Sequence, residues 1–355
     1  MKVSRGFLAA LCALLSLASF ADAPRAVPSD TRAAFLKLLD RPRVALEPEL
    51  IELPAVEGFH KFHLWISTEA AERVPGYLLL PDAVRFPGKR PVVIALHGTG
   101  GSKDNGQIAG IVLQAVRAGF IGVAIDGRFH GERVAAGSGE RAYDDAIARA
   151  FESGHGHPFY YDTVWDVMRL IDYLQSRKDV DGARIGLTGI SKGGIETYLA
   201  AAADPRVAAA VPYIGVQSFK WELDNGQWHA RIHTIQDGFE AAAKLAGKSP
   251  EDAAFVRQFY ARVVPGIDGV FDGPAMLPLI APRPLLVVNG DSDANTPIAG
   301  VRLAVNAAKS AYDAANASDH LQLMIEEDTP HRVNPDAIEA GIAWFVRWLR
   351  PVPIS

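Results

Sequence analysis

Apolar residues occur along the chain in two kinds of segment, which follow one another in a regular order. Short continuous apolar runs are typical of strands covered on both faces of a sheet, and apolar residues recurring every three or four positions are typical of helices. The predicted strands lie at 90–97, 120–125, 184–189, 207–214, 284–290 and 321–325. The predicted helices lie at about 105–118, 160–176, 192–203, 298–312 and 335–349. Strands that alternate with helices are joined by crossovers, so the pattern predicts an α/β fold with a mostly parallel central sheet flanked by helices.

The segment before this alternation has a different pattern. Strand-like stretches at 59–68 and 76–80 are joined by a polar turn, which is typical of an antiparallel pair. Residues 24–58 are rich in proline and arginine and contain one amphipathic piece at 29–39. We interpret them as an N-terminal extension of a single domain that spans 59–355.

The first residues predict export of the protein. A basic start is followed by an apolar run from Phe7 to Phe20 and by Ala21-Asp22-Ala23, which are the three parts of a cleavable signal peptide. We therefore expect residues 1–23 to be removed near Ala23 and the protein to be periplasmic or secreted. An uncleaved N-terminal anchor is the alternative. Cys12, the only cysteine of the 355 residues, lies inside this segment, so the mature fold is expected to hold without disulfides.

Composition excludes two classes of partner. The formal net charge is −5 and there is no run of basic residues, which argues against nucleic acid. Beyond residue 23 the sequence has no apolar stretch of the length that a membrane span needs. A small molecule is therefore the expected partner, and the oligomeric state is left open.

A serine bracketed by glycines joins a predicted strand to a predicted helix. Gly189-Ile190-Ser191-Lys192-Gly193 has the G-x-S-x-G pattern of a nucleophile elbow, a sharp turn that projects the serine hydroxyl above the sheet. A surface turn with a chance match is the alternative. The strand before it and the helix after it favour the elbow, so Ser191 is the predicted nucleophile.

A serine hydroxyl needs a base to take its proton and a third group to orient that base. His331 follows the last predicted strand and lies downstream of the serine and of a loop with two carboxylates, Asp291 and Asp293. We expect His331 to be the base. Either aspartate suits the third position, and the other would then cap the helix that follows.

The loop after the strand ending at 97 is the predicted oxyanion hole. His97-Gly98-Thr99-Gly100-Gly101 contains three glycines, which let backbone N–H groups approach a tetrahedral oxygen closely. We expect the N–H groups of Thr99 and Lys192 to be the donors. His97 is expected to brace this loop and not to transfer protons.

The substrate pocket has four candidate residues. Arg128 and His130 follow the next strand, 120–125, and therefore lie near the same rim; ion pairs within their own loop are the alternative role for the charged residues there. Between 216 and 282 the alternation of strands and helices is lost, and we expect a helical insertion that forms a cap over the carboxyl edge of the sheet. Trp221 and Trp228 lie in this insertion and contribute either to the pocket or to its own core.

A metal site is not expected. His155-Gly156-His157 places two imidazoles close together, but no third ligand follows at a spacing typical of zinc sites.

These motifs, in the order Ser, Asp, His, resemble those of the α/β-hydrolase superfamily over about residues 60–350. The superfamily's acid loop commonly reads Gly-x-x-Asp-x-x-small-Pro, and aligning Gly290 and Pro297 with it implies Asp293 as the acid, with Asp291 as the competitor. The loop 126–133, the helix start 161–166 and the Ser-x-Gly-Gly elbow resemble the branch that holds dienelactone hydrolases and acetyl xylan esterases. Dienelactone hydrolases have shorter chains and a cysteine nucleophile, so their substrate is not carried over.

The resemblance and the residues together predict a secreted serine hydrolase without a cofactor. We expect it to cleave a carboxylic ester through a Ser-His-Asp triad and an acyl-enzyme. A peptidase or amidase of the prolyl-oligopeptidase kind is the nearest alternative, and a non-catalytic binding protein on a hydrolase scaffold is the alternative from another class. The acyl and alcohol groups are not specified, because the insertion and the rim loops build the pocket.

Overall fold

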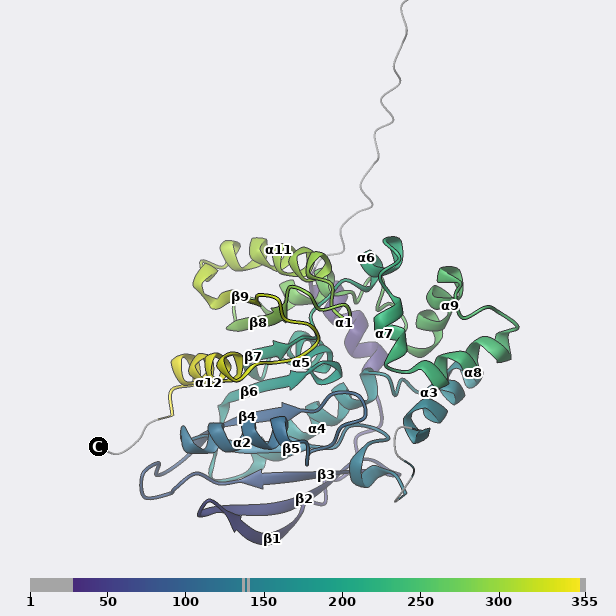
Figure 1. Ribbon diagram of the computed structural model, residues 1–355. Coiled ribbons are helices and arrows are strands. Elements are labelled where there is room, and N and C mark those ends of the chain that lie inside the picture. The colour runs from purple at the N-terminus through teal and green to yellow at the C-terminus, as the bar shows by residue number, and fades with distance from the viewer. Residues whose placement is uncertain (1–27, 136–137, 139–140, 352–355) are drawn as a thin grey trace, which may run out of the picture.

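A nine-stranded sheet runs through the centre of the structure, a computed structural model that describes residues 28–351 apart from 136–137 and 139–140 (Figure 1). The strands lie in the order β1-β2-β3-β5-β4-β6-β7-β8-β9. The pairs among β1, β2, β3 and β5 are antiparallel, and every pair from β5–β4 to β8–β9 is parallel. The predicted α/β-hydrolase fold with a mostly parallel sheet is confirmed, whereas the predicted signal peptide, residues 1–23, lies outside the described residues.

The strands occupy the predicted positions, with one addition. Their bounds are β1 (Glu49–Val56), β2 (Phe59–Glu69), β3 (Glu72–Leu79), β4 (Arg90–Leu96), β5 (Ile121–Ile125), β6 (Val180–Ile190), β7 (Val207–Tyr213), β8 (Leu285–Gly290) and β9 (Leu321–Glu326). All residues of β4, β5 and β8 are buried, as expected for strands covered on both faces.

Helices cover both faces of the sheet. On one face α2 (Gly106–Arg117) and α12 (Pro335–Leu349) form a hydrophobic cluster with the strands. The other face carries the larger cluster, to which the helices between β7 and β8 and five further helices contribute. These are α1 (Pro28–Leu39), α3 (Arg141–Ser153), α4 (Tyr161–Ser176), α5 (Lys192–Ala203) and α11 (Ile298–Ala314).

One strand and one α-helix outside the insertion were not predicted from the sequence. β1 pairs with β2, so the sheet begins inside the segment that we interpreted as an N-terminal extension. Its residues are mostly exposed, and its pairing with β2 shifts register between Leu53 and Val56, which fits an edge strand that contains a proline. α3 was missed although its buried residues, from Tyr143 to Phe151, recur every three or four positions; this face packs on α8 and α9 of the insertion.

The segment between β7 and β8, which we interpreted as an insertion, is helical. It contains α6 (Phe219–Asp224), α7 (His229–His233), α8 (Gln236–Ala246), α9 (Ala253–Val263), α10 (Gly273–Met276) and the 3₁₀ turn Leu277–Ile280. Helices α6 to α9 lie together at one side of the molecule, next to α3 (Figure 1). Within the part of the chain that the structure describes, no helix has the length and apolar character to cross a membrane.

Strand register brings four distant loops to one edge of the sheet. Leu96 pairs with Gly189, so the loops that leave β4 and β6 lie side by side. Gly290 pairs with Glu326, which does the same for the loops that leave β8 and β9. The carboxyl ends of parallel strands are where α/β sheets bind ligands, and all the predicted catalytic residues follow these four strands.

Candidate active site

Ser191 has a strained backbone between β6 and α5. Its φ is 57° and its ψ is −115°, a region that residues with a side chain rarely adopt. The turn is so tight that a Cβ at Gly193 would lie 2.3 Å from the carbonyl oxygen of Leu96. The sequence pattern therefore forms the sharp turn expected of a nucleophile elbow.

The His331 imidazole lies between Ser191 and Asp293. Its Nε2 is 2.8 Å from the Ser191 hydroxyl oxygen, and its Nδ1 is 2.7 Å from Oδ2 of Asp293. An ionised carboxylate accepts hydrogen bonds but donates none, so Nδ1 carries the hydrogen and Nε2 presents its lone pair to the hydroxyl proton. This is the geometry in which an imidazole acts as a base toward a serine.

Asp293 is buried, and its carboxylate is fully engaged. Oδ1 accepts from the backbone N–H groups of Asn295 and Thr296 at 2.8 and 3.2 Å, and Oδ2 also accepts from the Thr296 hydroxyl at 2.8 Å. Burial alone raises the pKa of Asp293, but the hydrogen bonds and charge of His331, with those of Thr296 and Asn295, outweigh burial and leave the pKa below its ordinary value. The competitor Asp291 is exposed, and its carboxylate accepts from Ser292 and the Thr329 N–H instead.

The two residues predicted to donate to an oxyanion lie next to Ser191. Lys192 is the first residue of α5, and the first N–H groups of a helix have no acceptor within it. Thr99 lines the same cavity as Ser191 and His331. The loop passes so close to Ser191 that a Cβ at Gly98 would lie 3.4 Å from the Cβ of Ser191.

Two buried histidines hold the predicted oxyanion loop. His130 accepts from the Gly100 N–H at Nε2, at 3.2 Å, while its Nδ1 lies 2.7 Å from the carbonyl oxygen of Arg128. His97 accepts from the Gly127 N–H at 2.9 Å. Burial, followed by the charge of Lys192, lowers the pKa of His97 to about 4 and that of His130 to about 2. Both rings therefore stay neutral and keep the lone pairs that these hydrogen bonds need.

Arg128, predicted as a substrate contact, instead forms buried ion pairs. Its Nε lies 2.8 Å from Oδ2 of Asp166, and its Nη2 contacts Glu69. Arg133 approaches the same carboxylate at 2.6 Å. Burial alone raises the pKa of Asp166, but the two guanidinium groups hold it well below its usual range. Arg128 therefore forms ion pairs, as the alternative role expected, but its partners lie on β2 and α4 and not within its own loop.

The side chain of Lys192 points away from the cavity into the protein. Its ammonium lies 2.6 Å from Oε1 of Glu196, one turn along α5, and both side chains are 1 % exposed. Burial raises the pKa of Glu196 to about 7 in spite of this lysine. Only the backbone of Lys192 is therefore available to a ligand at Ser191.

The cavity around Ser191 has a volume of about 400 Å³. Besides Ser191, Ile190, His331 and the residues Gly98 and Thr99 of the predicted oxyanion loop, it is lined by residues that we did not predict: Gln107, Ile214, His233, Thr234, Asn295, Arg332 and Val333. Trp221 and His130 do not line it, whereas Trp228 lines a neighbouring cavity. Of these lining residues, only Asn295 could have been found from the sequence, because it lies two residues after the predicted acid Asp293. His233 and Thr234 belong to the insertion, and no sequence motif indicates where the insertion packs.

Among the described residues there is no group of three or more His, Cys, Asp or Glu side chains that could hold a metal ion.

Comparison with known proteins gives two family matches. The model of the family described as acetyl xylan esterase (AXE1) matches residues 36–233, and that of the prolyl oligopeptidase family matches residues 149–351. Each match covers more than half of the chain.

The curated relatives include several ester hydrolases. YitV of Bacillus subtilis (strain 168), an inferred esterase, is 28% identical over 73% of this chain and 89% of its own length. The 4-O-methyl-glucuronoyl methylesterase 1 of Wolfiporia cocos is 26% identical over 52% of this chain and 45% of its own.

A solved structure, acetyl xylan esterase 1 from Thermoanaerobacterium sp. JW/SL YS485, shares the fold at a TM-score of 0.68. The alignment has 20% identity and covers 92% of this chain and 95% of that one.

The ion pairs of Asp166 predict a specific loss of stability. Asp166→Asn leaves two buried guanidinium groups without their shared carboxylate, so we expect the free energy of unfolding to fall by about 3 kcal/mol. Because the folded pKa of Asp166 is depressed, this difference is complete above the unfolded pKa of about 3.9 and is lost as the pH falls toward the folded value. Urea denaturation at several pH values measures it.

The matched control is Asp319→Asn. Asp319 pairs with Arg347 at 3.5 Å, and both side chains are more than half exposed, so the free energy of unfolding is expected to change by less than about 0.5 kcal/mol. Equal losses in the two variants would contradict the role given to Asp166.

Proposed function

Because the chain belongs to the acetyl xylan esterase (AXE1) family and is a carboxylic ester hydrolase, we propose that it cleaves its substrate through Ser191, His331 and Asp293. The observation that supports this proposal best is the hydrogen-bond chain from the Ser191 hydroxyl through His331 to the buried Asp293. It has the three groups that activate a serine, in the order that activation requires.

The first half-reaction acylates the serine. His331 Nε2 takes the hydroxyl proton while Ser191 Oγ attacks the ester carbonyl carbon, and Asp293 stabilises the imidazolium that forms. The carbonyl oxygen becomes an oxyanion that accepts from the N–H groups of Thr99 and Lys192. The tetrahedral intermediate collapses, the bond to the alcohol oxygen breaks, and His331 gives its proton to that oxygen.

The second half-reaction releases the acid. His331 takes a proton from water, and the resulting hydroxide attacks the acyl carbon of the ester on Ser191. Collapse of the second tetrahedral intermediate returns the proton to Ser191 Oγ and frees the carboxylic acid. The family and the names of the curated relatives support an ester of a carbohydrate with a short acyl or methyl group. The N-terminal pattern supports action outside the cytoplasm.

A peptidase or amidase is the second candidate, because the prolyl oligopeptidase model matches residues 149–351. The same triad can attack an amide, so the assay must compare the two bonds directly. We expect turnover of p-nitrophenyl acetate and none of an aminoacyl p-nitroanilide. The reverse preference would replace the esterase proposal with the peptidase.

Labelling with a fluorophosphonate tests the nucleophile. The probe phosphonylates an activated serine, so it should label the wild type and leave Ser191→Ala unlabelled, as seen by fluorescence after electrophoresis. Equal labelling of both proteins would assign the reactive serine elsewhere, and labelling of neither would favour the non-catalytic binding protein.

Substitution of the two aspartates tests the acid. Asp293→Asn cannot hold the Nδ1 hydrogen of His331 in the same way, so we expect kcat for p-nitrophenyl acetate to fall by about 10⁴-fold. Asp291→Asn is the matched control and should keep the wild-type kcat, because Asp291 is exposed and does not contact His331. A larger loss in Asp291→Asn would reverse the assignment.

His130 holds the predicted oxyanion loop by a hydrogen bond, so substitutions at position 130 are expected to lower kcat to different degrees. His130→Leu removes the acceptor for the Gly100 N–H, so the loop loses its register with Ser191 and kcat should fall on the order of tenfold to a hundredfold. His130→Gln places an amide oxygen near the position of Nε2 and should recover part of the loss. Steady-state kinetics measures both. A purely structural role for His130 would instead lower thermal stability in both variants and leave kcat of the folded enzyme unchanged.

A further inference from the structure

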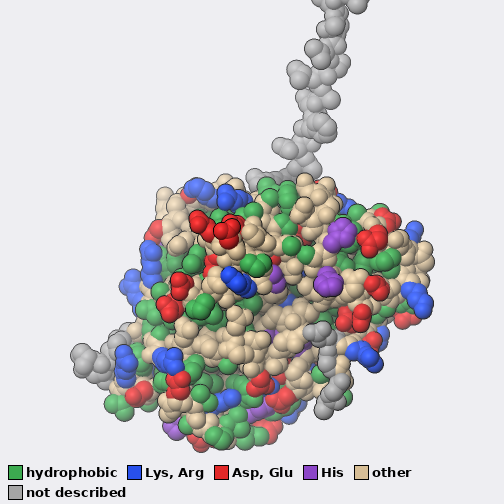
Figure 2. Space-filling view, viewed as in Figure 1, with side chains coloured by type: hydrophobic (Ala, Val, Ile, Leu, Met, Phe, Trp, Pro, Cys, Tyr) green, Lys and Arg blue, Asp and Glu red, His purple; other side chains and the backbone are tan. Residues whose placement is uncertain are grey.

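Arg231 is a buried cation in α7 that the proposed mechanism does not use. It is 1 % exposed, whereas His229 and His233 of the same helix are exposed. Figure 2 shows histidine side chains at the surface over α7, so the helix turns its histidines outward and its arginine into the protein. Arg231 lines neither the cavity around Ser191 nor the neighbouring cavity that Trp228 lines. Any effect of this residue on a ligand at Ser191 must therefore pass through other residues.

The guanidinium of Arg231 is not neutralised by a contacting carboxylate. None of the ion pairs between described residues involves Arg231, and its Nε has no hydrogen-bond partner among them. Glu222 interacts with its charge from beyond ion-pair distance, and neither carboxyl oxygen of Glu222 has a partner among the described residues. A cation buried without a contacting counter-charge costs stability, and costs of this kind are typical of functional sites.

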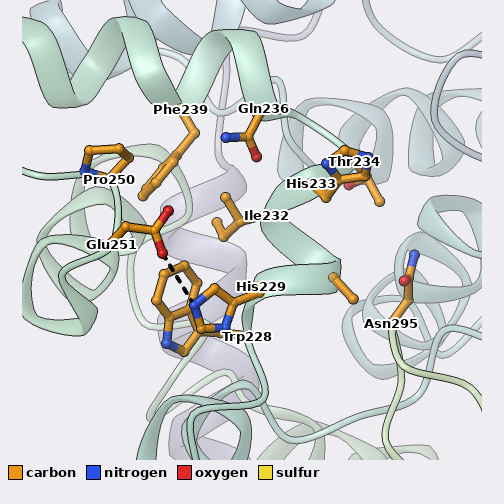
Figure 3. Close-up of a pocket in the computed structure, with 11 residues that line it drawn as sticks. Trp228, His229, Ile232, His233, Thr234, Gln236, Phe239, Pro250, Glu251 and Asn295 are labelled. Atoms are coloured by element: carbon orange, nitrogen blue, oxygen red, sulfur yellow. Dashed lines mark ion pairs between the residues drawn. The ribbon is translucent and has the colours of Figure 1, made fainter.

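Arg231 instead donates to two uncharged oxygens. Its Nη2 lies 2.8 Å from the backbone carbonyl oxygen of Asn295 and 3.2 Å from Oε1 of Gln217. Asn295 lies beside α7 and lines both cavities (Figure 3). One guanidinium of the insertion is thus joined to the loop that carries Asp293.

The carbonyl group that Arg231 contacts belongs to the same peptide unit as the N–H group of Thr296. That N–H donates to Oδ1 of Asp293 at 3.2 Å, and the Asn295 N–H donates to the same oxygen at 2.8 Å. A cation at the carbonyl end of a peptide unit polarises the unit and makes its N–H a stronger donor. The charge of Arg231 therefore acts on the Asp293 carboxylate through one peptide unit.

Asn289 also holds this loop, at the next peptide unit. Its side chain donates to the carbonyl oxygen of Thr296 at 3.0 Å and accepts from the Thr296 hydroxyl at 2.8 Å. Arg231 holds the preceding unit, whose N–H donates to Asp293. Loss of Arg231 is therefore expected to free the peptide between Asn295 and Thr296 while Asn289 keeps the loop folded.

We propose that Arg231 is a positioning residue for the reaction: it strengthens the hydrogen bond from the Thr296 N–H that fixes the Asp293 carboxylate. A fixed carboxylate keeps the His331 imidazole, 2.7 Å from it, in line with the Ser191 hydroxyl. The inference rests on the proposed function and adds to it that α7, from the insertion, takes part in aligning the triad.

Arg231→Met tests this role, because methionine is long and flexible but neither donates a hydrogen bond nor carries charge. We expect kcat for p-nitrophenyl acetate to fall on the order of tenfold to a hundredfold, since small displacements of catalytic groups have effects of this size. KM should stay within about twofold of the wild-type value, because Arg231 lines neither cavity. Arg231→Lys keeps the charge and a donor and should recover part of the lost kcat. Steady-state kinetics measures all three values.

The proton on Nδ1 of His331 gives a readout that does not need turnover. A hydrogen bond to a buried carboxylate moves this proton far downfield in a ¹H NMR spectrum and slows its exchange with water. In Arg231→Met the signal should shift upfield and exchange faster, because Asp293 is held less firmly. His331→Gln, which lacks the ring, identifies the signal. An arginine that only supports packing would leave the signal unchanged.

The matched control is Arg283→Met. Arg283 also donates to backbone carbonyl oxygens, among them those of Ala201 and Val207 at 2.6 and 2.7 Å. It precedes β8, so it lies at the opposite end of that strand from Asp293. The control variant should lose thermal stability and keep the wild-type kcat and His331 signal.

Two results would overturn the proposal. One is a wild-type kcat with an unshifted His331 signal in folded Arg231→Met. The other is an equal loss of kcat in Arg283→Met, because the effect would then follow stability alone. If Arg231→Met does not fold, Arg231→Lys decides in the same way, since an ammonium does not reproduce the planar donors of a guanidinium. A wild-type kcat and an unshifted signal in that variant would overturn the role.

Failure of this role and failure of the proposed function are distinguishable. If the wild type cleaves p-nitrophenyl acetate and Arg231→Met cleaves it equally well, the positioning role is refuted and the esterase stands. If the wild type cleaves no ester and the fluorophosphonate does not label Ser191, the proposed function itself is refuted.

Discussion

The hydrogen bond between the His331 imidazole and the buried Asp293 is the interaction on which the site depends. Asp293 is almost fully buried and accepts from four donors, two of them backbone N–H groups of its own loop. This carboxylate therefore has one orientation, and it fixes the tautomer of His331. The lone pair of Nε2 then faces the Ser191 hydroxyl, which the strained backbone at position 191 projects toward it. A different tautomer in the same place would offer the hydroxyl a donor and give no activation.

Several charged groups near the predicted oxyanion loop are held inside the protein. Four cations there are paired, Lys192 with Glu196, Arg128 and Arg133 with Asp166, and Lys103 with Asp126, whereas Arg332 lines the cavity around Ser191. The groups that touch the loop itself are neutral imidazoles and backbone atoms. Donors held in this way do not have to reorient when the oxyanion forms, which is the main electrostatic contribution to such reactions.

The sequence predicted the parts of the site that follow strands and failed for those that depend on tertiary contacts. Ser191, Asp293 and His331 lie at the carboxyl ends of β6, β8 and β9, and a parallel sheet brings such positions to one edge whatever their separation in sequence. The resemblance was needed to prefer Asp293 to Asp291, since spacing alone suits both. The structure then separates them by burial and by the contact with His331.

Arg128 and Asn295 illustrate why the rest was not predictable. An arginine on a rim loop has the same local pattern whether it meets a substrate or a buried aspartate. Its role was decided by Asp166 of α4, which no motif connects to position 128. Asn295 was noticed only as part of the acid loop. Its position between two cavities depends on Arg231 of α7, in the insertion before β8. Insertions vary in length and packing more than strand ends do, so the residues that an insertion places beside the cavity follow no fixed pattern, while the residues at the strand ends do.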